Sequence, residues 1–278
     1  MAEFRLPVSG LDVVFRQATG AEDVLLVEET VLDIRLALAM LDALGRLPDG
    51  HPVPWESLSI TDLDAALLAI RRSFVGNQVR STVRCTATAR SQALAGGEQD
   101  PADENTGACH ARVDIAFNID DYLAYHAPAP PRGVSQAEEP GWFRLGGTAV
   151  TYRLATCADQ IAVAGRLDAE RELVRRCIRP ASLSGPLRRK TEAAMSRLAP
   201  NLFDYIEGIC PECQSTIRIS FDPQRYVLGE MRERAKFVFE EVHLIAARYQ
   251  WSEREILALP RTRRARYAEL VYEAREVG

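Results

Sequence analysis

Two stretches of the chain occur twice, and this repetition constrains the fold more than any other feature. Residues 14–23, VFRQATGAED, are matched by residues 151–160, TYRLATCADQ, at an offset of 137. Residues 109–118, CHARVDIAFN, are matched by residues 213–222, CQSTIRISFD, at an offset of 104. Two matches in the same order with a shrinking offset predict a duplicated module, with about 33 extra residues in the first copy.

Each copy is predicted to contain a strand, helices and a cysteine-bearing β-hairpin. The first copy opens with a strand over residues 11–15 and a turn at Thr19-Gly20. Its helices are expected over residues 24–44 and 61–73, the latter with Thr61 as N-cap. The corresponding helices of the second copy are expected over residues 169–177 and 190–198, the latter ended by Pro200. Alternating apolar residues then indicate a half-buried strand in each copy: Val113, Ile115 and Phe117, and Ile217, Ile219 and Phe221.

Composition suggests where these modules end. Residues 91–108 are small, polar and acidic, so we expect a mobile loop there. Residues 126–141 are rich in proline, which is typical of a linker. The sequence thus predicts an α+β protein with a first module at 1–127, a second at 142–225 and a helical C-terminal region at 226–278.

The overall composition is that of a globular protein. Hydrophobic residues make up 47% of the chain and charged residues 26%, with a net charge of −5. This charge gives no reason to expect nucleic-acid binding. No apolar run approaches the roughly 20 residues of a membrane helix, and the N-terminus lacks the pattern of a signal peptide. We therefore expect a cytoplasmic protein whose six cysteines are reduced or bind metal.

Four of the cysteines suggest a zinc site. Residues 210–213, Cys-Pro-Glu-Cys, form a C-x-x-C before a predicted strand, and such a turn supplies two of the four ligands of a structural zinc ion. The repeat matches Cys109 to Cys213, and Cys85 follows a strand-like segment as Cys210 does. The hypothesis is a four-thiolate zinc site that joins the copies through Cys85, Cys109, Cys210 and Cys213.

Two other interpretations of these cysteines remain open. The first interpretation is a redox-active C-x-x-C. Such a motif usually opens a helix after a strand, whereas this one precedes a strand. The second interpretation is a former zinc-binding turn that no longer holds metal. It is suggested by the roughly 20 additional residues that separate Cys85 from Cys109, compared with Cys210 and Cys213. Cys157 and Cys177 lie in ordinary apolar patterns, so we expect both to be small core residues.

The C-terminal region begins with a helical pattern. Apolar positions step by three or four residues, which indicates one face of a long helix. These positions are Val227, Met231, Ala235, Val238, Val242, Ile245 and Tyr249. This face packs either into the protein's own core or against a partner.

A second helix starts at a clear signal after this one. Ser252 and Glu255 form a capping box, and Trp251 and Ile256 a hydrophobic staple. After Leu259-Pro260, an arginine run leads into a last amphipathic helix through Leu270. The run faces either solvent or an acidic partner. The candidate partner-binding residues are Trp251, Ile256, Arg261, Arg263, Arg264 and Arg266.

Catalytic patterns find little support in the sequence. None of the four histidines lies in a metal-ligand or nucleophile motif, and Gly146-Gly147 is expected to be a turn rather than a phosphate-binding loop. The paired acids Glu240-Glu241 are expected on an exposed surface. The sequence therefore predicts a protein that is not an enzyme.

These features together resemble a phage-tail family. The resemblance lies in residues 11–23, 210–222 and 239–267, and the last block, with EVHLIA, YQWSEREILALP and RRARY, is the most specific. The family is that of baseplate hub assembly proteins of contractile-tailed phages and phage-like contractile injection systems. The resemblance implies a non-enzymatic role in baseplate or tail assembly, one form of which is a chaperone absent from the finished particle.

Two functions follow as expectations. The first is an assembly or structural protein of a phage-like tail, with other baseplate or tail proteins as partners and zinc as cofactor. The alternative is a zinc-ribbon regulatory protein that binds nucleic acid through its C-terminal arginines. Salt-dependent DNA binding would distinguish the second from the first.

Overall fold

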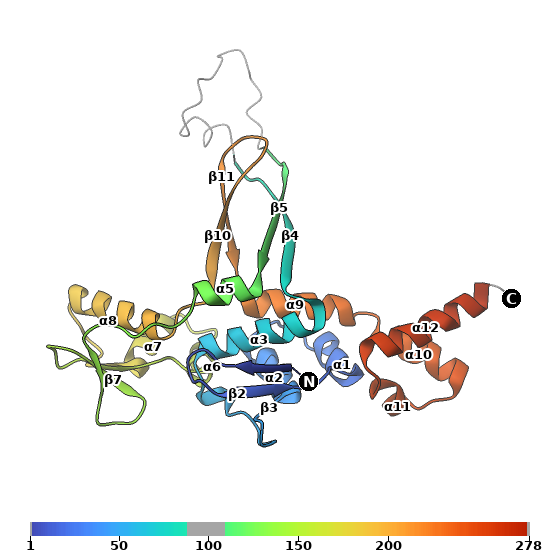
Figure 1. Cartoon of the computed structure of the whole chain (residues 1–278), viewed down its shortest axis with the longest axis horizontal. Helices are drawn as coiled ribbons and strands as arrows, with labels where there is room; N and C mark the ends of the chain where they lie inside the picture. The colour runs from blue at the N-terminus through green and yellow to red at the C-terminus, as the bar shows by residue number, and fades with distance from the viewer. Residues whose placement is uncertain (1, 88–108, 277–278) are drawn as a thin grey trace, which may run out of the picture.

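The computed structural model describes residues 2–87 and 109–276 of the chain. It is a mixed α+β structure with small antiparallel sheets and a helical C-terminal region. Figure 1 shows an elongated body from which two β-hairpins project side by side, with the C-terminal helices at one end. Among the described residues, no helix is both long and apolar enough to cross a membrane.

The first half runs from a three-stranded sheet, in the order β1-β2-β3, to a projecting hairpin, β4-β5. Its elements are β1 (Ala2–Arg5), β2 (Asp12–Phe15), α1 (Gly20–Glu28), α2 (Ile34–Leu44), β3 (Gly45–Arg46), the 3-10 turn η1 (Trp55–Ser57), α3 (Ile60–Val75), β4 (Gln78–Arg84), β5 (Arg112–Asn118) and α5 (Ile119–Tyr125).

The second half runs from a four-stranded sheet, in the order β6-β7-β8-β9, to the hairpin β10-β11 and then to the C-terminal helices. Its elements are β6 (Val134–Gln136), β7 (Trp142–Leu145), β8 (Thr151–Arg153), α6 (Cys157–Val163), α7 (Ala169–Cys177), β9 (Ile178–Arg179), α8 (Gly185–Leu198), β10 (Asp204–Ile209), β11 (Thr216–Phe221), α9 (Pro223–Ala235), α10 (Val238–Tyr249), α11 (Glu253–Leu257) and α12 (Arg261–Glu276).

The two halves follow the same order of elements. In each half, two strands (β1 and β2, or β7 and β8) are followed by two helices, a short strand, a helix, a hairpin and a further helix. The differences are that β6 precedes this series in the second half and that η1 lies within it in the first. The strand register also agrees, because Phe15 pairs with Gly45 in the first half as Tyr152 pairs with Ile178 in the second. The turn expected at Gly146-Gly147 connects β7 and β8, with Gly147 at a φ of 71°.

The residues repeated in the sequence form a hydrogen-bonded unit at the first helix of each half. In the first half, Arg16 Nη2 lies 2.6 Å from a carboxylate oxygen of Glu22, which is 4% exposed. The same carboxylate accepts from the backbone amide of Thr19, at 2.8 Å. The residues expected to form a turn at Thr19-Gly20 are therefore the N-cap and first residue of α1.

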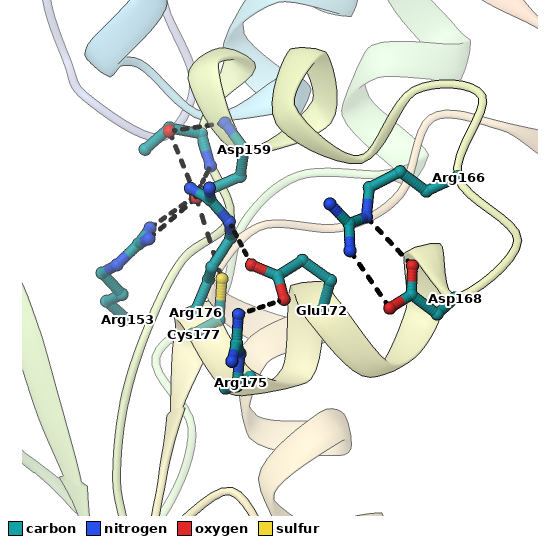
Figure 2. Close-up of polar contacts among 9 residues, drawn as sticks. Arg153, Asp159, Arg166, Asp168, Glu172, Arg175, Arg176 and Cys177 are labelled. Atoms are coloured by element: carbon teal, nitrogen blue, oxygen red, sulfur yellow. Dashed lines mark hydrogen bonds and ion pairs between the residues drawn. The ribbon is translucent and has the colours of Figure 1, made fainter.

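The second half repeats this unit around Asp159, as Figure 2 shows. The Arg153 guanidinium donates to both Asp159 carboxylate oxygens, at 2.5 and 2.9 Å. The Thr156 amide donates to the same carboxylate at 3.0 Å. Arg176 Nη1 lies 3.4 Å from an Asp159 carboxylate oxygen, and Arg176 Nε lies 3.0 Å from a Glu172 carboxylate oxygen. The ion pairs around Asp159 therefore extend into α7.

The main hydrophobic core crosses the boundaries expected from the sequence. It contains the apolar faces of α2 and α3 together with Cys157 and Phe221 from the second half and Val227, Leu228 and Met231 from α9. A smaller core around Tyr152 and Ile178 lies within the second half. Residues 1–127, 142–225 and 226–278 therefore all contribute to one core.

The helix expected over residues 24–44 is two helices. Residues 29–33 separate α1 from α2. Asp33 starts α2, because its carboxylate accepts from the backbone amides of Arg35 and Leu36 at 2.8 and 3.3 Å. The prediction missed this second N-cap within an apolar segment.

The N-cap expected at Thr61 is Ser59 instead. The Ser59 hydroxyl accepts from the Asp62 amide at 3.1 Å, so α3 begins at Ile60. The Thr61 hydroxyl donates to the carbonyl oxygen of Pro200 at 2.8 Å. Thr61 thus connects α3 to the segment after α8.

The long helix expected from residue 226 to 249 is divided at Lys236 and Phe237 into α9 and α10. The division lets α9 pack on α1 and α3 while α10 packs on α12. Neither glycine nor proline marks the break in the sequence. Five of the seven predicted apolar positions are buried: Val227, Met231, Ala235, Val238 and Ile245.

The remaining predictions about elements fall into three groups. The helix over residues 169–177 is confirmed as α7, and residues 190–198 lie within the longer α8. Strand β6 lies inside the linker expected at 126–141 and pairs with β7. The loop expected at 91–108 lies outside the described residues.

Candidate metal centre

The two hairpins present their apolar faces to each other. In one hairpin Val79 pairs with Phe117, and in the other Asp204 pairs with Phe221. The first strands of the two hairpins therefore correspond at an offset of 125 residues, and the second strands at an offset of 104. Near the base, the Phe117 and Phe221 rings are 5.0 Å apart in an edge-to-face arrangement. Towards the tips, Val113 and Ile217 pack together with the cysteines. The alternation that predicted both strands is therefore confirmed.

The four cysteines singled out in the sequence meet at the tips of these hairpins. The Sγ atoms of Cys85, Cys109, Cys210 and Cys213 all lie within 4.8 Å of one another. Two of the pairs join the hairpins at short distance, with Sγ–Sγ separations of 3.7 Å for Cys85 and Cys213 and 3.8 Å for Cys109 and Cys210. Sulfur atoms around a tetrahedral metal with bonds of about 2.3 Å lie about 3.8 Å apart. Four cysteines in this arrangement could bind a metal ion.

The Cys85–Cys109 and Cys210–Cys213 pairs share two backbone features among the described residues. The His110 amide donates to the Cys85 carbonyl at 3.2 Å, and the Gln214 amide donates to the Cys210 carbonyl at 3.0 Å. The φ angles of His110 and Gln214 are 53° and 56°. Both residues follow the second cysteine of their knuckle in the left-handed region, which turns the chain back into the hairpin. At these described residues, the Cys85–Cys109 pair therefore matches the Cys210–Cys213 pair.

The cysteines differ in their tendency to ionise. The Ser215 side chain has the largest effect on the Cys213 thiol and the Ser215 backbone amide the next largest, and together they lower the pKa of Cys213 to about 6. The Ala87 amide favours the thiolate of Cys85, but desolvation and the neighbouring thiols outweigh it and raise the pKa of Cys85 to about 12. Four thiols this close titrate as one coupled group. Complete ionisation needs a positive charge between them, which is what a metal ion supplies.

The other two cysteines are in the cores, as the sequence predicted. Cys157 is 0% exposed in the main core and Cys177 is 1% exposed in the smaller one. Figure 2 places the Cys177 sulfur beside Asp159, and the two groups are 3.9 Å apart. Among the described residues, neither belongs to the cluster of four cysteines.

Two of the candidate partner-binding residues are turned inward. Ile256 is 0% exposed and Arg264 is 1% exposed. Arg264 Nε donates to Glu241 at 2.6 Å, and its Nη2 donates to Asp23. Burial leaves Ile256 and Arg264 unable to contact a partner, so the prediction is corrected for these two residues. Glu241, expected on an exposed surface, is part of the same ion-pair network.

The remaining candidates are partly or fully accessible. Arg261 binds Asp23 and is half-buried. The ring centroids of Trp251 and Tyr267 are 5.2 Å apart. The capping box predicted next to Trp251, formed by Ser252 and Glu255, is confirmed. Arg263 and Arg266 are exposed. Arg266 forms ion pairs with acids of its own helix, Glu269 and Glu273.

Sequence reasoning missed Asp23, a central residue of this network. Asp23 is 0% exposed and accepts from both Arg261 and Arg264. It is the last residue of the first repeated decapeptide, and the matching position in the second half is Gln160. That difference between the two repeated sequences was the available signal, because Asp23 binds the arginines whereas Gln160 lies beside Gln224.

No protein-family profile matches this chain, and no curated protein or solved structure shows significant similarity to it.

Proposed function

We propose that the cysteine cluster is a structural zinc site shared by two copies of a zinc-ribbon-like module. Its support is the set of four Sγ atoms within 4.8 Å, contributed equally by two hairpins of corresponding register. Thiolates suit zinc, and four protein ligands leave no open coordination position for a substrate. Zinc would therefore fix one hairpin against the other rather than perform catalysis.

We further propose that the protein acts in assembly of a phage-like tail baseplate, of a contractile phage or a contractile injection system, through protein–protein contacts. The resemblance of residues 11–23, 210–222 and 239–267 carries this proposal. A closed metal site is consistent with a non-enzymatic role. In this role, the candidate residues that contact the partner would be the accessible ones, Trp251, Arg263 and Arg266.

The nucleic-acid alternative receives less support. Arg261 and Arg264 bind Asp23 in the interior, and Arg266 is paired with acids of α12. Of the arginine run, Arg263 alone has no ion pair among the described residues. Such a surface has too little free positive charge for phosphate contacts to dominate binding.

Metal analysis of the purified full chain tests the zinc site. We expect one zinc ion per chain, and we expect Cys213→Ser to lose it because three ligands hold the ion far less tightly. Cys157→Ser is the matched control, since Cys157 is a buried cysteine outside the cluster, and it should keep full zinc content. Zinc-free wild-type protein would contradict the site.

Affinity purification tests the assembly role. The tagged chain, produced in cells that also produce the contractile tail, should retrieve baseplate or tail proteins. The double variant Arg263→Glu with Arg266→Glu should lose them, whereas Arg225→Glu, an exposed arginine on α9, should not. Salt-dependent DNA binding without any tail protein would instead favour the alternative.

A further inference from the structure

A pocket lies at the junction of the N-terminal sheet, the end of α3, α9 and the start of α12. Its volume is about 540 Å³. Apolar side chains contribute to its lining, including Phe15, Phe74 and Met231. This size is within the range of specific ligand pockets and exceeds what a single small anion would fill.

Three arginines from three separate elements line the same pocket. Arg16 follows β2, Arg234 is on α9 and Arg261 begins α12. None of the residues that line it is acidic. Each of the three arginines is paired with an acid outside the lining, Glu22, Glu230 and Asp23 respectively, so the pocket offers guanidinium N–H donors rather than unpaired charge.

The acidic partners of these arginines leave some of their N–H donors free. Asp23 accepts from Nε and Nη2 of Arg261, and no bond from its Nη1 falls within the described residues. Glu230 accepts from Nη2 of Arg234, again with no bond from Nη1 among the described residues. A guanidinium carries five donors, so both side chains can bind a further carboxylate while keeping their present partners.

We propose that this pocket binds an acidic peptide segment that also carries an apolar side chain. A carboxylate of the peptide would accept from Arg234 and Arg261, and its apolar neighbour would contact the half-buried Phe74 and Val75. A peptide fits better than a free anion because an apolar lining and free guanidinium donors occur together. The choice of a peptide rests on the proposed assembly function, in which the partners are proteins.

Fluorescence anisotropy with the full zinc-loaded chain tests the proposal. The probe is a fluorescein-labelled pentapeptide of alternating glutamate and phenylalanine, and its control has glutamine in place of glutamate. We expect the glutamate peptide to bind and the glutamine peptide to bind about tenfold more weakly or worse, because charge-assisted hydrogen bonds are lost.

Two variants locate the binding. Arg234→Glu should weaken the glutamate peptide by about tenfold or more. Arg225→Glu makes the same charge change on the same helix but outside the pocket lining, so it should leave binding unchanged. Far-UV circular dichroism establishes that both variants are folded, and the comparison of the two peptides needs no variant.

Three results would overturn the proposal: no binding of the glutamate peptide, equal binding of both peptides, or equal weakening by both variants. None of these measurements uses a tail protein. A failed purification of tail proteins alongside specific peptide binding would therefore overturn the assembly role and leave the pocket intact. The opposite pair of results would overturn the pocket alone.

Discussion

At the residue scale, the repeated sequence is explained by one hydrogen-bonded unit. An arginine at the end of a strand binds an acid in the first turn of the next helix, and that acid also accepts from the N-cap amide. Arg16 and Glu22 form it in the first half, and Arg153 and Asp159 in the second. The matching residues were visible in the sequence. Their contact was not visible, because the arginine lies at the end of a strand and the acid in the following helix, and neither the helical nor the strand period applies across that boundary.

Asp159 should make stability depend on acid pH. Burial alone would raise its pKa, but Arg153 and the Thr156 amide outweigh burial and lower the pKa from 3.8 to about 2. The folded state therefore binds the proton less readily than the unfolded state. This contribution is complete above about pH 4 and is lost as the pH falls towards 2. We expect Asp159→Asn to lower the free energy of unfolding at pH 7 by roughly 1 to 2 kcal/mol.

Denaturant unfolding of both proteins between pH 7 and about pH 2 measures this effect. The difference between wild type and Asp159→Asn should narrow as the pH falls below about 4. Asp168→Asn removes an exposed ion pair with Arg166 in the same half (Figure 2) and should lower the stability much less than Asp159→Asn does, because solvent screens an exposed pair. An effect of Asp159→Asn that stays constant across this pH range would refute the assigned ionisation.

At the element scale, strands were easier to predict than helix ends. Alternation of apolar residues identified β5 and β11, since a period of two places every second side chain on the same face of a strand. The division of α9 from α10 follows from what each segment packs against, which no local pattern records. The burial of Arg264 was missed for the same reason. An arginine is rarely buried unless it is paired, and its partner Asp23 lies 241 residues away in the chain.

Arg264 should hold the C-terminal helices onto α1. Arg264→Ala leaves the buried Asp23 with Arg261 as its remaining ion-pair partner and removes the bond to Glu241. Loss of one member of a buried ion pair costs about 3 kcal/mol or more. We expect limited proteolysis to cut the α10–α12 region much faster in this variant. Arg263→Ala, one residue away but exposed, should be cut at the wild-type rate, and equal cutting of both variants would refute the role of Arg264.

At the scale of the whole molecule, two clusters of side chains join the halves, besides single hydrogen bonds such as that from Thr61 to Pro200. One is the main core, to which both halves and α9 contribute. The other is the cysteine cluster at the hairpin tips, which pairs Cys85 with Cys213 and Cys109 with Cys210. The repeated sequence led to the prediction of the cluster, because matching cysteines implied matching hairpins. It did not predict the shared core, because the boundaries were inferred from composition, and composition does not record which surfaces pack together.

Removal of the proposed zinc ion should therefore loosen the hairpins without unfolding the body. The tips contain few apolar contacts besides the cysteine cluster, whereas α3 is buried in the main core. After chelation, we expect hydrogen exchange to accelerate at the tip-side amides of β5 and β10 and to remain slow in α3. The same chelator should change nothing further in Cys213→Ser, which already lacks one ligand. Loss of protection in α3 would show that zinc supports the whole fold, and unchanged hairpins would show that the cluster does not depend on metal.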